Sequence, residues 1–206
     1  MIDEFHCELI SWRRIHRLSR HLYKKIKKNG YNPDMIIAIA RGGYVPARIL
    51  CDFMDIYTLT SIRIVHYIAG AKKQKQARMT IPLCCDIRGK KVLLVDDVSD
   101  TGDTFDIALP YIRSLEPDEV KTAVLHHKKT SSYRPDFHAE KIVKWRWLIY
   151  PWAVIEDLSG FITQMDPVPD NMDKAAERLE ERYHFRVSKK IMEDVFSCLG
   201  PGYKKK

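Results

Sequence analysis

Three aspartates and two threonines cluster at the end of an apolar run in the segment Val92–Thr104. The segment reads Val-Leu-Leu-Val-Asp-Asp-Val-Ser-Asp-Thr-Gly-Asp-Thr. A strand that ends at Val95 and a helix that starts near Thr101 would leave backbone N–H groups pointing outward, at the positive end of the helix dipole. We therefore expect this turn to bind a phosphate.

The side chains around this turn suit one ligand. Thr101 and Thr104 can donate hydroxyl hydrogen bonds to a phosphate, and Gly102 lets the backbone approach it closely. Asp96 and Asp97 would lie about one ribose away, where they could hold two vicinal hydroxyls or orient a hydrated Mg²⁺. The pattern predicts a phosphorylated ribose as ligand. The alternative is that the aspartates only cap a helix.

Strands and helices alternate over the first two thirds of the chain. Apolar runs of strand length and stretches of helical spacing occur in turn. The predicted strands are 35–40, 57–68, 92–95 and 120–125, and the predicted helices are 11–28, 45–54 and 101–115. This alternation predicts an α/β fold, with a parallel sheet that has helices on both faces and a ligand crevice beyond the carboxyl ends of the strands.

Two further segments, 69–78 and the residues after 170, lie outside this alternation. The polar, basic stretch 69–78 lacks periodicity and is expected to be a long loop. Amphipathic helices are expected after residue 170, with Ser188 as the cap of the last one.

Composition limits the class of protein. The 206 residues are enough for one main domain, and 35 Lys and Arg against 27 Asp and Glu give a formal charge of +8, which favours anionic partners. No stretch reaches the roughly 20 apolar residues that cross a bilayer, and the N-terminus lacks the pattern of a secretory signal. We expect a cytoplasmic protein without a membrane partner, whose five cysteines are free thiols.

The apolar strand, the Asp-Asp pair and the Thr-Gly-x-Thr motif together resemble the binding motif for 5-phospho-α-D-ribosyl 1-pyrophosphate (PRPP) in type I phosphoribosyltransferases. This resemblance implies that Asp96 and Asp97 bind the ribose 2′ and 3′ hydroxyls. It also implies that the segment Asp100–Thr104, which includes Thr101, Gly102 and Asp103, wraps the 5′-phosphate. Mg²⁺ is the implied cofactor, held by Asp97 either directly or through water. Asp103 stands where relatives often carry glycine or a basic residue, so its side chain is expected to point away from the phosphate.

Further stretches, up to about residue 155, resemble the xanthine-guanine and hypoxanthine-guanine phosphoribosyltransferases. Those enzymes have an aspartate at the position of Asp100, which implies a catalytic role as the base that handles the purine N7 proton. The turn Arg41-Gly42-Gly43 is similar to their pyrophosphate-binding turn, where a non-proline cis peptide is often found. We expect the N–H groups of Gly42 and Gly43 to be free to bind pyrophosphate.

The same resemblance implies a purine site and a lid. Lys128 corresponds to a lysine that donates to the 6-oxo group of the purine, Trp147 to an aromatic residue that stacks on the base, and Leu148 to a position whose backbone reads the base edge. Tyr67 is similar to the tyrosine of a Ser-Tyr pair in the catalytic lid, although His66 replaces the serine. Ile149 replaces an acid of the bacterial xanthine-guanine enzyme, which leaves the choice among xanthine, guanine and hypoxanthine open.

The resemblance therefore implies a type I phosphoribosyltransferase domain over residues 1–155, with a small hood at about 140–155, and a helical C-terminal extension over 156–206 of unknown role. The implied function is transfer of the phosphoribosyl group from PRPP to N9 of a 6-oxopurine in purine salvage, by a dimer or tetramer. Two alternatives stay open: transfer to another base, and a non-catalytic regulator that senses PRPP and binds nucleic acid. A nucleic-acid partner is the less expected of these.

Overall fold

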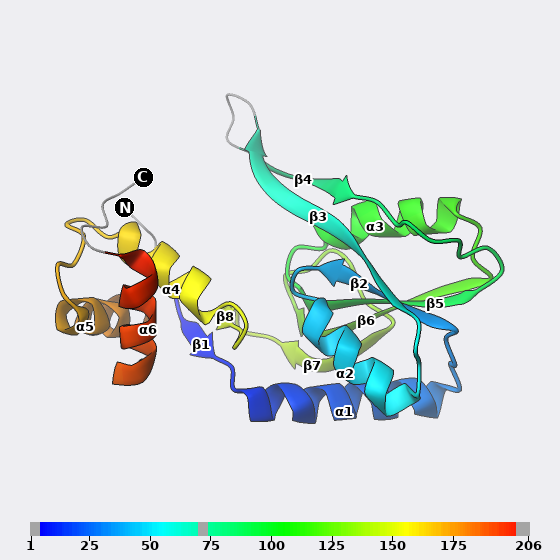
Figure 1. Ribbon diagram of the computed structural model, residues 1–206, viewed down its shortest axis with the longest axis horizontal. Helices are drawn as coiled ribbons and strands as arrows, with labels where there is room; N and C mark the ends of the chain where they lie inside the picture. The colour runs from blue at the N-terminus through cyan, green and yellow to red at the C-terminus, as the bar shows by residue number, and fades with distance from the viewer. Residues whose placement is uncertain (1–4, 70–73, 201–206) are drawn as a thin grey trace. The chain divides into compact units, whose positions relative to one another are not determined.

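The chain divides into two compact units. One is formed by Arg13–Lys144, and the other joins Met1–Trp12 to Trp145–Lys206. The computed structural model describes residues 5–69 and 74–200, without the side chains of 67–69 and 74–76 (Figure 1). The segment expected to be a hood, beyond Lys144, thus shares its unit with the helices of the C-terminal extension.

The larger unit contains a six-stranded sheet with the strand order β4-β3-β2-β5-β6-β7. Every pair of neighbours is parallel except β3 and β4, which are antiparallel. The strands are β2 (Met35–Ala40), β3 (Leu59–Ala69), β4 (Gln74–Ile81), β5 (Lys91–Ser99), β6 (Glu119–Lys128) and β7 (Phe137–Ile142). The predicted α/β class with a mainly parallel sheet is confirmed.

The loop prediction for residues 69–78 is wrong over most of its length. Residues 74–81 form β4, in which Arg78 pairs with Val65 of β3. β4 is an edge strand, and basic residues such as its Lys75 and Arg78 are typical of edges because charged residues there oppose pairing with other chains. Ala77 and Met79 of this strand pack against the core. Lys72 and Lys73 of the same stretch lie outside the described residues.

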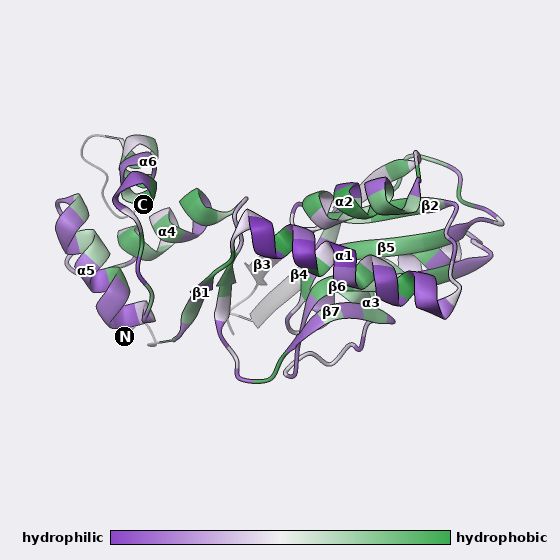
Figure 2. Ribbon diagram, turned by 90° about the horizontal axis from the view of Figure 1, so that it is seen from below, coloured by the Kyte–Doolittle hydropathy of each residue, from purple (hydrophilic) through white to green (hydrophobic). Residues whose placement is uncertain are grey.

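Helices cover both faces of this sheet. α1 (Trp12–Asn29) and α2 (Tyr44–Met54) lie on one face and α3 (Asp103–Ser114) lies on the other, as Figures 1 and 2 show. α1 buries one apolar stripe, made of Ile15, Leu18, Leu22 and Ile26. Phe105 and Ile112 of α3 join the core on the opposite face. The sheet is therefore protected from water on both sides, as a mainly parallel sheet requires.

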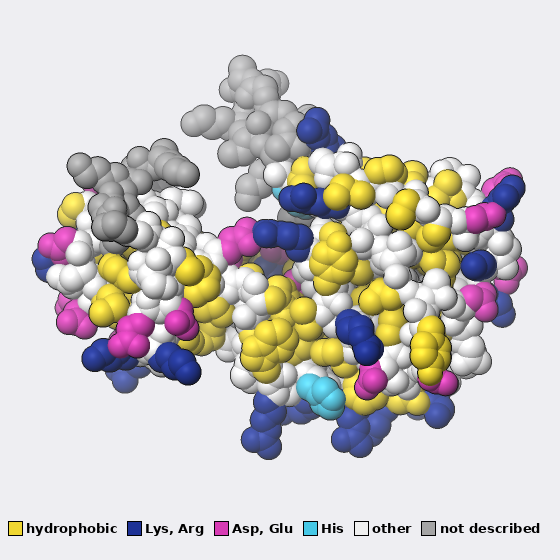
Figure 3. Space-filling view, viewed as in Figure 1, with side chains coloured by type: hydrophobic (Ala, Val, Ile, Leu, Met, Phe, Trp, Pro, Cys, Tyr) yellow, Lys and Arg dark blue, Asp and Glu magenta, His cyan; other side chains and the backbone are white. Residues whose placement is uncertain are grey.

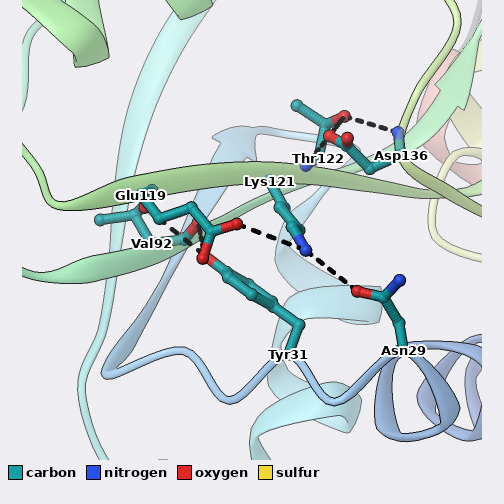
Figure 4. Close-up of polar contacts among 7 residues, drawn as sticks. All are labelled: Asn29, Tyr31, Val92, Glu119, Lys121, Thr122 and Asp136. Atoms are coloured by element: carbon teal, nitrogen blue, oxygen red, sulfur yellow. Dashed lines mark hydrogen bonds and ion pairs between the residues drawn. The ribbon is translucent and has the colours of Figure 1, made fainter.

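Polar contacts fasten the amino-terminal edge of the sheet (Figure 4). The hydroxyl of Tyr31, in the link between α1 and β2, donates to the Val92 carbonyl over 2.7 Å. Lys121 of β6 contacts Asn29 of α1 at 2.9 Å, and its ammonium lies 4.6 Å from the centre of the Tyr31 ring. These contacts fix the end of α1 against β5 and β6.

The smaller unit combines a two-stranded sheet with three helices. β1 (Cys7–Leu9) pairs in parallel with β8 (Trp147–Ile149), and the helices are α4 (Val154–Thr163), α5 (Met172–Tyr183) and α6 (Lys189–Leu199). Their shared core includes Ile149, Leu158, Leu179 and Val195. Ser188 caps α6 as predicted, because its hydroxyl accepts a hydrogen bond from the Ile191 N–H. None of the described helices is long and apolar enough to cross a membrane.

Candidate functional site

The predicted donor residues meet at the carboxyl ends of three neighbouring strands. Arg41 follows β2, Asp100 follows β5, and Lys128 is the last residue of β6. Because β5 lies between β2 and β6 in the sheet, these residues share one edge although they are distant in sequence. This edge is where ligands bind in open parallel sheets.

The acidic pair lies within a strand and not in the turn that follows it. The prediction that the strand ends at Val95 is wrong, because β5 continues to Ser99 and pairs with β6 as far as Ser99 and His127. Asp96 and Asp97 are therefore held by the sheet. Successive strand residues point to opposite faces. Asp96 is 8% exposed, and Asp97 is half-buried.

The helix of the predicted phosphate turn begins later than expected. α3 starts at Asp103, not near Thr101, and Gly102 caps it with a φ of 108°. That conformation favours glycine. A Cβ atom at Gly102 would also lie 2.4 Å from the Ser132 hydroxyl. Asp103 and Asp106 occupy the first turn of α3, where a carboxylate interacts favourably with the positive end of the helix dipole. The orientation of Asp103 away from a bound phosphate stays a prediction.

Burial and charge repulsion act together on the acidic pair. Desolvation raises the pKa of Asp96 well above its ordinary value, and the neighbouring Asp97 carboxylate raises it further. The N–H of Asp97 donates to the Asp96 carboxylate over 2.9 Å, which partly offsets both effects. Such an acid is stabilised in its charged form by a ligand that donates hydroxyl hydrogen bonds or by a cation.

The Arg41-Gly42-Gly43 turn packs directly against this pair. The peptide bond between Ala40 and Arg41 is cis, as the resemblance implies. A Cβ atom at Gly42 would lie 2.3 Å from a carboxylate oxygen of Asp97, so only glycine fits without moving that side chain. The proposed ribose-binding and pyrophosphate-binding residues are thus neighbours.

One detail of the predicted turn is wrong. The N–H of Gly43 is not free for a ligand, because it donates to the Ile39 carbonyl over 2.9 Å. Gly43 instead has a packing role, since a Cβ atom there would lie 2.4 Å from the Val95 carbonyl oxygen. The reason is the tightness of the turn, which brings the backbone back onto β2 and β5.

Asp100 and Lys128 form an ion pair. The ammonium of Lys128 lies 2.7 Å from a carboxylate oxygen of Asp100, and the Lys128 side chain is 3% exposed whereas that of Asp100 is 35% exposed. A buried ammonium needs such a partner, because leaving a charge unpaired away from water is costly. The structure thus joins the predicted catalytic residue to the predicted purine-binding residue.

Sequence reasoning missed the segment that braces the phosphate turn. Ser132 donates to the Thr101 carbonyl through both its N–H and its hydroxyl, each over 2.8 Å. The Thr130 hydroxyl donates to the Asp100 carbonyl over 3.3 Å. These residues follow β6, and only the pairing of β5 with β6 brings them to the turn. No local motif marks them.

His66 is a second residue whose position the sequence did not reveal. Its Nε2 atom lies 3.2 Å from the hydroxyl of Thr104, within hydrogen-bonding distance. The neighbouring Tyr67 belongs to β3, where it pairs with Gln76, but its side chain lies outside the described part of the structure. The lid role of Tyr67 therefore stays a prediction.

Trp147 and Leu148 belong to the smaller unit. Trp147 is half-buried, and its ring centre lies 6.3 Å from that of Phe161 and 6.4 Å from that of Phe5. Leu148 is 6% exposed and pairs with Glu8 of β1. Stacking of a purine on Trp147 stays a prediction.

No group of three or more metal-binding side chains is found among the described residues. The oxygen atoms of Asp97 nevertheless suit Mg²⁺, which binds proteins through one or two carboxylates and takes its other ligands from water and substrate phosphates. A site with one metal-binding carboxylate would suit a metal that arrives with a phosphorylated substrate.

Comparison with known proteins identifies the class that this fold and site define. The family model described as the phosphoribosyl transferase domain matches residues 8–155. The chain therefore belongs to the phosphoribosyltransferase family. Residues 156–206 lie beyond the match.

Individual relatives agree with this assignment. A xanthine-guanine phosphoribosyltransferase of Ruegeria sp. is 32% identical over 153 residues, which cover 69% of this chain and 83% of the relative. The crystal structure of a purine phosphoribosyltransferase from Pyrococcus horikoshii superposes with a TM-score of 0.62 at 33% identity, and covers 71% of this chain and 93% of that one. The structure of a hypothetical protein from Neisseria gonorrhoeae, solved with bound ppGpp, superposes with a TM-score of 0.65 at 30% identity. The superposition covers 72% of this chain and 89% of the Neisseria chain.

Proposed function

We propose that this protein is a purine phosphoribosyltransferase that transfers the 5-phosphoribosyl group of PRPP to N9 of a 6-oxopurine. The observation that carries this proposal is the ion pair between Asp100 and Lys128 at the edge that also holds Asp96 and Asp97. Asp100 would accept a proton and Lys128 would donate to an oxo group, and both lie at the same edge as Asp96 and Asp97, which would bind the ribose. The names of the relatives from Ruegeria and Pyrococcus support the same reaction.

The donor would be held by two neighbouring groups of residues. Asp96 and Asp97 would accept hydrogen bonds from the ribose hydroxyls, and the turn from Asp100 to Thr104 would bind the 5′-phosphate at the start of α3. Arg41 would contact the pyrophosphate, with Gly42 allowing its close approach to Asp97. Mg²⁺, bound through Asp97 and the pyrophosphate, would neutralise charge on the leaving group.

The acceptor would bind beside Lys128. An ammonium donates hydrogen bonds and accepts none, so it suits the 6-oxo group of guanine, xanthine or hypoxanthine and opposes the 6-amino group of adenine. N9 forms a bond to the anomeric carbon while the bond from that carbon to the pyrophosphate oxygen breaks, with inversion. Asp100 takes the proton from N7, and its negative charge stabilises the cationic character that develops on the ribosyl group.

The decisive experiment is an assay for base preference. The protein is incubated with Mg²⁺ and PRPP, together with guanine, xanthine or hypoxanthine, and with adenine, uracil and orotate in parallel reactions. Nucleoside monophosphates are separated chromatographically, and released pyrophosphate is measured independently. Products from the 6-oxopurines support the proposal. Products only from a pyrimidine or adenine would assign another base, and no nucleotide from any base would overturn it.

We also propose that ppGpp binds to this site and competes with PRPP. The support is the relative from Neisseria, whose structure contains ppGpp. This nucleotide combines a 6-oxopurine, a ribose and two pyrophosphate groups, which are the chemical features that the residues above would recognise. Raising the PRPP concentration should then relieve inhibition of the transfer by ppGpp. Inhibition that saturating PRPP leaves unchanged would contradict a shared site.

A further inference from the structure

Helix α1 carries the whole net charge of the chain. Its 18 residues include eight Lys and Arg and no Asp or Glu. Without these eight, the 35 basic residues of the chain fall to 27, which equals its 27 acidic residues. Taken together, the residues outside α1 therefore carry no formal net charge.

Six of these basic side chains form one exposed stripe. At 100° per residue they lie within one side of the helix, opposite the buried apolar stripe that includes Leu22. The six exposed residues are Arg13, Arg17, Arg20, Lys24, Lys27 and Lys28. Figure 2 shows α1 in front of the sheet, and Figure 3 shows dark blue side chains projecting along the lower edge where α1 runs.

The other two basic residues of α1 are tied to β7 by polar contacts. Arg14 pairs with Glu140 at 2.9 Å, and Lys25 donates to the His138 carbonyl over 2.7 Å. Within the part of the chain that the structure describes, none of the six stripe residues forms an ion pair. Lys27 contacts the hydroxyl of Tyr23, which belongs to the same helix, at 3.3 Å. The stripe is therefore not needed to hold α1 on the sheet.

The stripe also opposes helix stability. Like charges three or four residues apart repel, and such spacings link Arg13 to Arg17 and Arg20 to Lys24. Arg13 lies in the first turn, where the helix dipole disfavours a cation. Only Lys27 and Lys28, in the last turn, are placed favourably for the dipole. An anionic partner would remove the repulsion along the whole stripe.

We propose that α1 binds the phosphate backbone of duplex nucleic acid, independently of the phosphoribosyl transfer. The stripe runs from Arg13 to Lys28, for about 23 Å at 1.5 Å per residue, with a cation on every turn, and so matches a straight and regularly charged polymer. Anionic membranes fit less well, because surface helices insert an apolar face, and the apolar face of α1 is buried against the sheet. Single strands fit less well, because their binding sites present aromatic residues for stacking, whereas the two aromatic residues of α1 already contact other rings. Tyr23 stacks against Phe53, and Trp12, which is 57% exposed, has its ring centre 5.9 Å from that of Trp152.

The test compares two variants of the full chain that lose the same number of arginines and lysines. The stripe variant carries Arg17→Gln, Lys24→Gln, Lys27→Gln and Lys28→Gln, and glutamine keeps the helix propensity high. The control carries Arg186→Gln, Lys174→Gln, Lys189→Gln and Lys190→Gln, all of them exposed residues of the smaller unit.

Binding to a labelled DNA duplex of arbitrary sequence is measured by fluorescence anisotropy over a range of salt concentrations. The slope of log K against log salt should fall by about 3 to 4 in the stripe variant, because each lost phosphate contact removes about 0.9. The control should keep the slope of the natural chain. Thermal unfolding confirms that both variants fold. The proposal would be overturned if the salt slope fell equally in the two variants, or if the natural chain did not bind the duplex. Binding that depends on the stripe but occurs only with anionic vesicles would also overturn it.

Discussion

The ammonium of Lys128 contacts the carboxylate of Asp100 at 2.7 Å, across the ends of two neighbouring strands. The lysine is almost fully buried and the aspartate is one-third exposed. Each residue therefore holds the other in place before any substrate binds. A purine that uses both must insert its oxo group and its N7 beside an ion pair that already exists.

Replacement of Asp100 should slow turnover without an equal loss of donor affinity. A general base contributes about 10²- to 10⁴-fold to rate, so we expect a fall of that order in kcat for Asp100→Asn. Asparagine keeps an oxygen that can accept from Lys128, so the loss reports on the proton acceptor itself. Steady-state kinetics with varied PRPP give kcat and KM. An equal change in donor binding and turnover would argue against the role as base.

Lys128→Gln should weaken binding of 6-oxopurines in particular. Hydrogen bonds that involve a charged group contribute about 1.5–3 kcal/mol, so KM for guanine should rise roughly 10- to 100-fold. Glutamine can both donate and accept, so discrimination against adenine should also fall. The neighbouring Lys129 is exposed and provides the control, since Lys129→Gln should leave KM for the base almost unchanged. A similar rise in KM in both variants would show that the loss of positive charge in general causes the effect, and not the loss of a donor to the 6-oxo group.

Much of this site was predictable from local sequence, because its chemistry is concentrated in short motifs. The Asp-Asp pair and the Asp-Thr-Gly-Asp-Thr motif mark the proposed PRPP-binding residues, and the strand alternation predicts that this turn and the turn at Arg41 reach the same edge. Lys128 was singled out by the family resemblance. The length of β5 was not predictable, because pairing with β6 carries the strand past Val95 through polar residues. Ser132 was missed for the same reason, since its role depends on which strands are neighbours.

Gly42 and Gly43 should respond differently to alanine. At Gly42 the added Cβ would displace the Asp97 carboxylate, so Gly42→Ala should weaken PRPP binding more than it lowers stability. At Gly43 it would meet the Val95 and Ile39 backbone, which cannot move cheaply, so Gly43→Ala should lower the melting temperature. Calorimetry for stability and titration with PRPP separate the two effects.

Gly160 provides the matched control for these two variants. It lies inside α4 with open space around its Cβ position, so Gly160→Ala should stabilise the protein by about 0.5–1 kcal/mol, since alanine favours helix. Equal melting temperatures for Gly43→Ala and the natural chain would contradict the packing role of Gly43.

The raised pKa of Asp96 should make stability depend on pH. Its pKa in the folded chain lies well above the ordinary value of 3.8, because of desolvation first and Asp97 second. The folded state thus binds the proton more tightly than the unfolded state, and stability falls as pH rises from about 4 through the folded pKa. Asp96→Asn should therefore raise the melting temperature at pH 8, and the gain should disappear towards pH 4. The same substitution should weaken PRPP binding. A gain that does not change with pH would refute the ionisation as its cause.

The fold away from the site was less accessible from sequence. β7 was not predicted, because it mixes charged and apolar residues. α4 falls mostly within the helical extension expected from residue 156, but its bounds were not predicted, because it has no side-chain cap at Ala153. β4 resembled a loop because most of its residues are polar or basic. In each case the burial that stabilises the element comes from residues distant in sequence, which periodicity alone does not report.

The contact between Tyr31 and Val92 should contribute measurably to stability, although it is remote from the site. The Tyr31 side chain is buried, and its hydroxyl donates to a backbone carbonyl of β5 over 2.7 Å. Tyr31→Phe removes the donor and leaves a buried acceptor without it, which should cost about 1–2 kcal/mol of unfolding free energy. Tyr57 is 91% exposed, so Tyr57→Phe should change stability by less than about 0.5 kcal/mol. Denaturant unfolding of both variants measures the difference. The contact fixes the entry into β2 and does not involve the carboxyl edge of the sheet, so kcat should be unchanged in both variants. A large loss of turnover in Tyr31→Phe would contradict this and show that the two edges of the sheet are coupled.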